Sequence, residues 1–138
     1  MEQAVFESIA YAAGCQDRGA EMECRGVQAL VNDSLRWDTE SRCSACGFAV
    51  AVCGGDLSGE LRALLLSRDG AARLRLDPTA RHAVIMRVLR AELGIGLADV
   101  RSVLNEVVAG RYSGTMPEME HLARALRASG IDAVAARP

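Results

Sequence analysis

The chain has 138 residues, of which half are hydrophobic and a quarter are charged. This length and composition exclude a large multidomain enzyme and a disordered chain, and they suit one domain or two very small ones. No apolar run approaches the roughly 20 residues that span a bilayer. The N-terminal residues Met1-Glu2-Gln3-Ala4 have no basic segment followed by an apolar stretch, so we expect a cytoplasmic protein without a signal peptide.

The two halves of the chain differ in charge. Residues 1–70 contain 6 Arg and 11 acidic residues, for a net charge of −5, whereas residues 71–138 contain 10 Arg and 7 acidic residues, for a net charge of +3. All five cysteines also lie in the first half. The asymmetry predicts a Cys-rich zinc module over residues 1–70 and a separate α/β domain over residues 71–138.

Hydrophobic spacing in the first half predicts several short elements. Phe6, Ile9, Ala10 and Ala13 are spaced like one face of a helix that ends at Gly14. In chain order we predict a helix over residues 4–13, a loop over 15–24, a strand at 35–38, an apolar strand at 48–52 and a helix over 58–67.

The second half gives clearer signals. Apolar residues alternate with Arg over residues 72–76, which is typical of a half-buried strand. Asp77-Pro78 has the form of an N-cap followed by a helix-starting proline, and Thr115 with Glu118 has the form of a capping box. The predicted order is strand (72–76), helix (78–93), helix (97–108), short strand or turn (110–114), helix (from 115) and strand (131–136). Two helices packed on one face of a small sheet would bury this pattern, so we predict an α+β protein.

The cysteines form one recognisable motif. Cys43-x-x-Cys46-Gly47 has the spacing of a zinc knuckle, in which a tight turn points two thiolates at one metal ion, and a strand follows as in a zinc ribbon. A structural site needs two more ligands, for which we predict Cys24 and either Cys15 or Cys53. The alternatives are reduced structural thiols and a redox pair. A redox C-x-x-C motif should open a helix, and residues 48–52 have the pattern of a strand instead.

Residues of the second half resemble a known family. The resemblance rests on the run His82 to Arg90, on Gly94-Ile95-Gly96-Leu97, on Asp99 and Arg101, and on Glu118 to Ala136. Residues 72–136 resemble the C-terminal domain of the bacterial ribosomal stalk protein, the globular part that contacts translational GTPases. The resemblance implies a βααβαβ domain, here preceded by an unrelated zinc-ribbon-like module.

The resemblance also implies a partner-binding patch on the first two helices of this domain. It would consist of Ala83, Val84, Ile85, Arg87, Arg90, Leu97, Asp99 and Arg101.

An independent pattern draws attention to the same helix. Apolar residues lie on two sides of residues 78–93, with Met86 and Leu89 on one side and Val84 and Val88 on the other. One core does not need both sides. Either the first half covers the second side, or it is an exposed binding patch edged by arginines such as Arg87.

These patterns favour a non-catalytic protein-interaction protein, adaptor or regulator, with a translational GTPase as the first candidate partner. No phosphate-binding loop or nucleophile elbow is present in the sequence, and neither histidine is placed for catalysis, so we do not expect an enzyme. One alternative is a zinc-dependent nucleic-acid-associated regulator, although the sequence pI of about 5.7 is low for that class. A second alternative is a small thiol redox protein.

Overall fold

The protein is mixed α+β, as predicted, in a computed structural model that describes residues 4–15 and 20–138. The chain divides into two compact units, Met1–Asp69 and Gly70–Pro138. This division lies next to the predicted boundary after residue 70.

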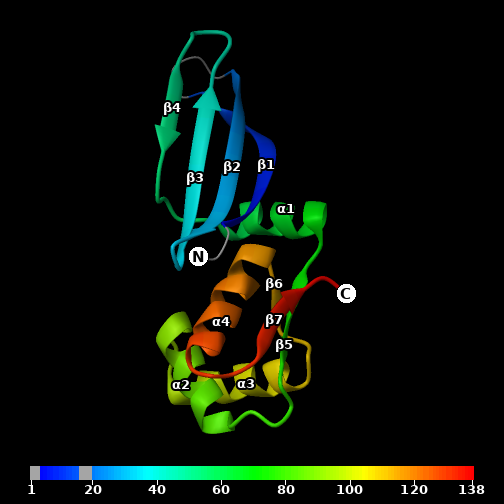
Figure 1. Cartoon of the computed structure of the whole chain (residues 1–138). Helices are drawn as coiled ribbons and strands as arrows, with labels where there is room; N and C mark the ends of the chain where they lie inside the picture. Colours follow the sequence, from blue (N-terminus) through cyan, green and yellow to red (C-terminus); the bar gives the residue numbers. More distant parts are fainter. Residues whose placement is uncertain (1–3, 16–19) are drawn as a thin grey trace. The chain divides into compact units, whose positions relative to one another are not determined.

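The first unit is an antiparallel meander followed by one helix. Its strands lie side by side in chain order (Figure 1): β1 (Val5–Gly14), β2 (Glu21–Val31), β3 (Ser34–Arg42) and β4 (Ala49–Val52). The helix α1 (Gly59–Asp69) begins after Ser58, whose hydroxyl oxygen accepts a hydrogen bond from the Leu61 N–H at 3.2 Å. The strand predicted at 48–52 and the helix predicted at 58–67 are confirmed.

Two predictions for this unit are wrong. Residues 4–13 do not form a helix but most of β1, and residues 21–24 of the predicted loop belong to β2. Pairing along the full length of both strands, from Val5 with Leu30 to Gly14 with Glu21, outweighs the weak helical spacing. Phe6, which the predicted helix would place on the same face as Ile9, is 65% exposed.

The core of the first unit is small and has Trp37 at its centre. Trp37, Ile9 and Leu65 are buried together, so α1 contributes one fully buried side chain to the sheet. The indole ring lies directly over Gly26 on the neighbouring strand. A Cβ atom at Gly26 would overlap Cη2 and Cζ2 of the Trp37 ring, so only glycine leaves room for this packing.

The second unit has the element order β5 (Ala72–Leu76), α2 (His82–Leu93), α3 (Leu97–Val108), β6 (Ser113–Gly114), α4 (Met116–Ala128) and β7 (Ala133–Ala136). β5 is the central strand of the three-stranded sheet and pairs antiparallel with both β6 and β7. α4 packs on β5 and β7, α3 packs on β5, and α2 packs on α3 and α4. These elements enclose one core that includes Leu74, Leu89, Leu104 and Leu126.

Local backbone and side-chain geometry fixes the start of α4 and the end of α2. The predicted capping box of α4 is confirmed: the Glu118 N–H donates to the Thr115 hydroxyl at 3.3 Å, and the Thr115 N–H donates to the Glu118 carboxylate at 3.0 Å. Between α2 and α3, Gly94 adopts a left-handed φ of 63°.

The predicted start of α2 is wrong. The Asp77 carboxylate accepts hydrogen bonds from the Thr79 N–H at 2.9 Å and the Thr79 hydroxyl at 2.8 Å, so it closes a local turn and α2 begins only at His82. The backbone hydrogen bond from Thr79, followed by that of its hydroxyl, lowers the pKa of Asp77.

Replacing Gly26 tests the packing of Trp37. Gly26→Ala should lower the free energy of unfolding by about 1–3 kcal/mol, because the new methyl group must displace the indole ring. Gly14→Ala is the matched control, because a Cβ atom there meets no atom within 4 Å. Denaturant unfolding measures both variants, and equal effects would contradict the close approach of Trp37 to Gly26.

The second unit should fold by itself, because its core contains residues of this unit only and α4 begins with a complete capping box. Expressed alone, residues 70–138 should give a dispersed amide NMR spectrum and a cooperative thermal melt. A non-cooperative melt would contradict this expectation.

Candidate functional site

Three cysteine thiols meet at one end of the first unit. Cys15 directly follows β1, and Cys43 and Cys46 lie in the connection between β3 and β4. In an antiparallel meander these two connections lie at the same end of the sheet. The three sulfur atoms lie within 4.8 Å of one another, and those of Cys15 and Cys46 are 3.7 Å apart.

The local backbone holds two of these thiols in a tight turn. The Cys43 N–H donates to the Phe48 carbonyl at 2.7 Å, and the Gly47 N–H donates to the Cys43 carbonyl at 2.8 Å. Gly47 adopts a positive φ of 75°, which lets the chain reverse immediately after Cys46. The motif therefore forms the turn that the C-x-x-C-Gly spacing predicts.

The electrostatics of the turn favour a thiolate at Cys43. Hydrogen bonds from the backbone of Cys46, and more weakly from Cys46 and Cys15 side chains and the backbone of Ala45, lower the pKa of Cys43 against an opposing effect of burial. The pKa of Cys46 is raised: a backbone hydrogen bond at Phe48 opposes the rise, but Cys43, burial and Cys15 together outweigh it. Backbone N–H groups aimed at sulfur also stabilise metal-bound thiolates.

The cluster can hold a metal ion. Thiolates are the preferred protein ligands of soft and borderline metals such as Cu(I) and Zn²⁺. Cys15 and Cys43 are buried and Cys46 is half-buried, so the sulfur atoms are shielded from solvent. All three cysteines are free thiols, and a 3.7 Å separation is far beyond the roughly 2.05 Å of a disulfide.

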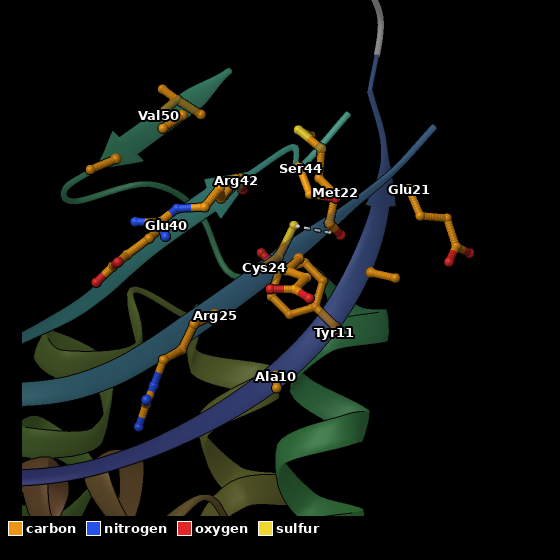
Figure 2. Close-up of a pocket in the computed structure, with 15 residues that line it drawn as sticks. Ala10, Tyr11, Glu21, Met22, Cys24, Arg25, Glu40, Arg42, Ser44 and Val50 are labelled. Atoms are coloured by element: carbon orange, nitrogen blue, oxygen red, sulfur yellow. Dashed lines mark hydrogen bonds between the residues drawn. The ribbon is translucent and has the colours of Figure 1, made fainter. Parts of the chain in front are cut away.

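The other two cysteines lie outside this cluster. Cys24, predicted as the third ligand, is buried on β2, and its thiol points to the Met22 carbonyl at 3.8 Å (Figure 2). Cys53, predicted as a possible fourth ligand, is exposed. Cys15 thus joins the C-x-x-C pair in the place predicted for Cys24. The sequence concealed this because a helix over residues 4–13 gives no reason to place Cys15 beside the knuckle.

The thiol end of the sheet also carries an open groove of about 960 Å³ (Figure 2). Charged residues line it, among them Arg25, Glu40 and Arg42. Tyr11 lies opposite Cys24 on the neighbouring strand, and burial, followed by the charge of Cys24, raises the pKa of Tyr11. The mixed signs of these charges give the groove no clear preference for an anion or a cation.

A second groove, of about 570 Å³, lies on the second unit along α2 and the start of α3. Met86, Ile95 and Leu97 contribute large apolar side chains, and Arg87 and Arg90 contribute charge. We call this surface the α2 groove; Ala83, Met86, Arg87, Arg90, Ala91, Ile95 and Leu97 line it. Leu97 is 50% exposed, so half of a large apolar side chain is accessible at this surface.

The predicted partner-binding patch overlaps this groove only in part. Of the patch residues, Ala83, Arg87, Arg90 and Leu97 line the groove, whereas Asp99 and Arg101 are exposed on α3 outside it. The remaining two, Val84 and Ile85, are respectively half-buried against the core and buried within it.

The idea that α2 has a surplus apolar side is wrong for its central residues. Ile85 and Val88 are 1% and 7% exposed, and both belong to the core that contains Val100 and Leu104. α2 packs on both α3 and α4, so this unit by itself buries more than one side of the helix.

Comparisons with models of protein families, with curated proteins and with solved structures gave no significant match to this chain. Among the described residues, no helix has the length and apolar character required to cross a membrane.

Substitutions of single cysteines test the metal ligands. Cys15→Ser should weaken Co²⁺ binding and reduce the thiolate-to-metal absorption band, because it removes one of the three clustered thiolate ligands. Cys24→Ser is the matched control, since it removes a buried thiol outside the cluster, and it should keep the band. The reverse pattern, with Cys24 required and Cys15 dispensable, would contradict this assignment.

Proposed function

We propose that the protein is a non-catalytic interaction module whose second unit binds a segment of another protein in the α2 groove. The observation that carries the proposal is the combination in this groove of exposed Leu97, half-buried Met86 and Ile95, and two exposed arginines. An apolar centre flanked by Arg is the usual composition of a protein-binding surface.

The chemistry of the groove favours an amphipathic helix with acidic flanks as the bound segment. Its apolar side chains would contact Met86, Ile95 and Leu97, and its carboxylates would pair with Arg87 and Arg90. A translational GTPase is the first candidate partner, because Ala83, Arg87, Arg90 and Leu97 occupy positions of the GTPase-contacting patch that the family resemblance implies. The cytoplasm, where these GTPases act, is the compartment that the proposal requires.

We propose further that the metal ion is zinc and that its role is structural. Sulfur atoms bound tetrahedrally at about 2.3 Å from zinc lie about 3.8 Å apart, close to the 3.7 Å between Cys15 and Cys46. The described residues supply three of the four ligands that such a site takes. A metal ion here would connect the two hairpin ends of a unit whose own core is small, and its binding would add to the stability of the fold.

A thiol redox function is the second candidate. The lowered pKa of Cys43 and the closeness of the Cys15 and Cys46 sulfur atoms favour it. Against it, the motif leads into strand β4 and not into a helix that would stabilise a reactive thiolate. No observation specifically favours the nucleic-acid alternative, so we place the structural metal first.

Charge reversal on the α2 groove tests the proposed function. The double variant Arg87→Glu/Arg90→Glu should weaken binding to a purified translational GTPase, or to a synthetic acidic amphipathic helix, by about tenfold or more. The salt dependence of binding should also fall, whereas the thermal midpoint should stay unchanged because both side chains are exposed. Isothermal titration calorimetry at two salt concentrations measures the affinity and its salt dependence.

Arg81→Glu is the matched control, because Arg81 is exposed just before α2 but neither lines the groove nor belongs to the patch that the resemblance implies. Leu97→Ala supplies the apolar counterpart and should weaken binding without a change in stability. If wild-type protein binds neither probe, or if Arg81→Glu is as damaging as the double variant, the proposal fails.

A further inference from the structure

Strand β4 forms an exposed edge of the sheet in the first unit. It is the last strand in the order β1-β2-β3-β4, and all four of its residues are exposed. Phe48, Val50 and Val52 are 43%, 40% and 47% exposed. Residues 43–55 contain no charged side chain and no proline, so the shortness of β4, four residues, is the one usual protective feature that this edge has.

The opposite edge of the same sheet is covered in part by α1. On β1, the Ser8 carbonyl accepts a hydrogen bond from the Arg68 guanidinium of α1 at 2.9 Å. A charged side chain therefore occupies this edge, which is an established way to prevent further strand pairing. The contrast identifies β4 as the edge that is open to a partner.

The hydrogen bonds of β4 show which backbone groups face outward. The bond from the Cys43 N–H to the Phe48 carbonyl marks residues 43 and 48 as a hydrogen-bonded pair. Hydrogen-bonded pairs alternate along an antiparallel ladder, so Val50, which lies opposite Ser41, also directs its N–H and C=O groups to β3. The N–H and C=O groups of Ala49 and Ala51 therefore point away from the sheet.

We propose that β4 pairs antiparallel with β4 of a second copy of this chain, about a two-fold axis at Val50. In this register Ala49 lies opposite Ala51 of the second copy and exchanges two hydrogen bonds with it, and the symmetry-related pair exchanges two more. These are the backbone groups that point outward, so the register uses all of them. The pairing joins two four-stranded sheets into one of eight strands.

The sequence of β4 suits pairing with itself. Val50 faces Val50 of the second copy as a non-hydrogen-bonded pair, in which side chains approach most closely. Phe48 faces Val52 of the second copy, and aromatic and β-branched residues stabilise each other when they lie across a strand pair. The absence of charge over residues 43–55 means that the two-fold axis brings no like charges together.

The interface is small, because each copy contributes one short strand, so the dimer should be weak and should depend on concentration. Sedimentation equilibrium of the full chain in reducing buffer should show a mass that rises from 14.7 kDa toward twice that value between about 10 µM and 1 mM. The reductant prevents crosslinking through exposed Cys53. A constant monomer mass up to 1 mM would overturn the proposal. It would do so even if β4 were found to bind a strand of another protein.

Proline substitution tests the edge. Ala51→Pro removes an outward-facing N–H group and leaves the hydrogen bonds to β3 intact, so it should weaken dimerisation at least tenfold without lowering the thermal midpoint. Ala12→Pro on the exposed opposite edge is the matched control and should leave the dimer unchanged. Equal effects of the two variants would overturn the assignment to β4.

Charge substitution tests the register and does not depend on proline. Val50→Lys and Val50→Glu should each reduce dimerisation at least tenfold, because each places like charges opposite one another. An equimolar mixture of the two variants should form a heterodimer, because lysine then faces glutamate. A mixture of Val52→Lys and Val52→Glu should show no such rescue, since residue 52 faces Phe48. Failure of the Val50 mixture to dimerise would overturn the proposed pairing.

Discussion

The alternating ends of an antiparallel meander are the constraint on which the first unit depends. Each hairpin reverses the chain, so the β1–β2 and β3–β4 connections lie at one end, and the tight Asn32-Asp33 turn, with two positive φ values, lies at the other. This brings Cys15 to the C-x-x-C turn across a separation of 28 residues in sequence. The same topology leaves β4 as an outer strand. The strand order of the meander therefore determines both the position of the thiol cluster and the exposure of β4.

The two units depend on different sources of stability. The second unit encloses a continuous apolar core in which Leu74, Leu89, Leu122 and Leu126 are fully or almost fully buried. Among the described residues of the first unit, the apolar cluster consists of Ile9, Trp37 and Leu65, with Leu30 and three cysteines buried outside it. Most residues of β3 and all of β4 retain contact with solvent. A unit with so little apolar burial gains proportionally more from any bond that connects its hairpins.

The sequence allowed more of the second unit to be predicted than of the first. Helix spacing and the Thr115–Glu118 capping box are local signals, and they identified α3 and α4. In the first unit, the C-x-x-C-Gly spacing was the local signal that identified its turn. Ala and Ser in β1 have weak preferences, so only pairing with β2, which is not visible in local spacing, makes this segment a strand. That error also concealed the position of Cys15. The burial of Ile85 and Val88 was similarly hidden, because it depends on how α3 and α4 pack around α2.

The pairing of β5 with β7 affects how the second unit folds. Leu74 pairs with Ala135, and α2, α3, β6 and α4 come between these two strands in the sequence. The three-stranded sheet is therefore complete only when residues far apart in the chain have paired. Such non-local pairing slows folding, whereas every strand pair of the first unit joins neighbours in the chain. The meander can therefore assemble by successive hairpins while β5 still lacks its partner. The first unit can therefore gain its structure during synthesis before the second unit is complete.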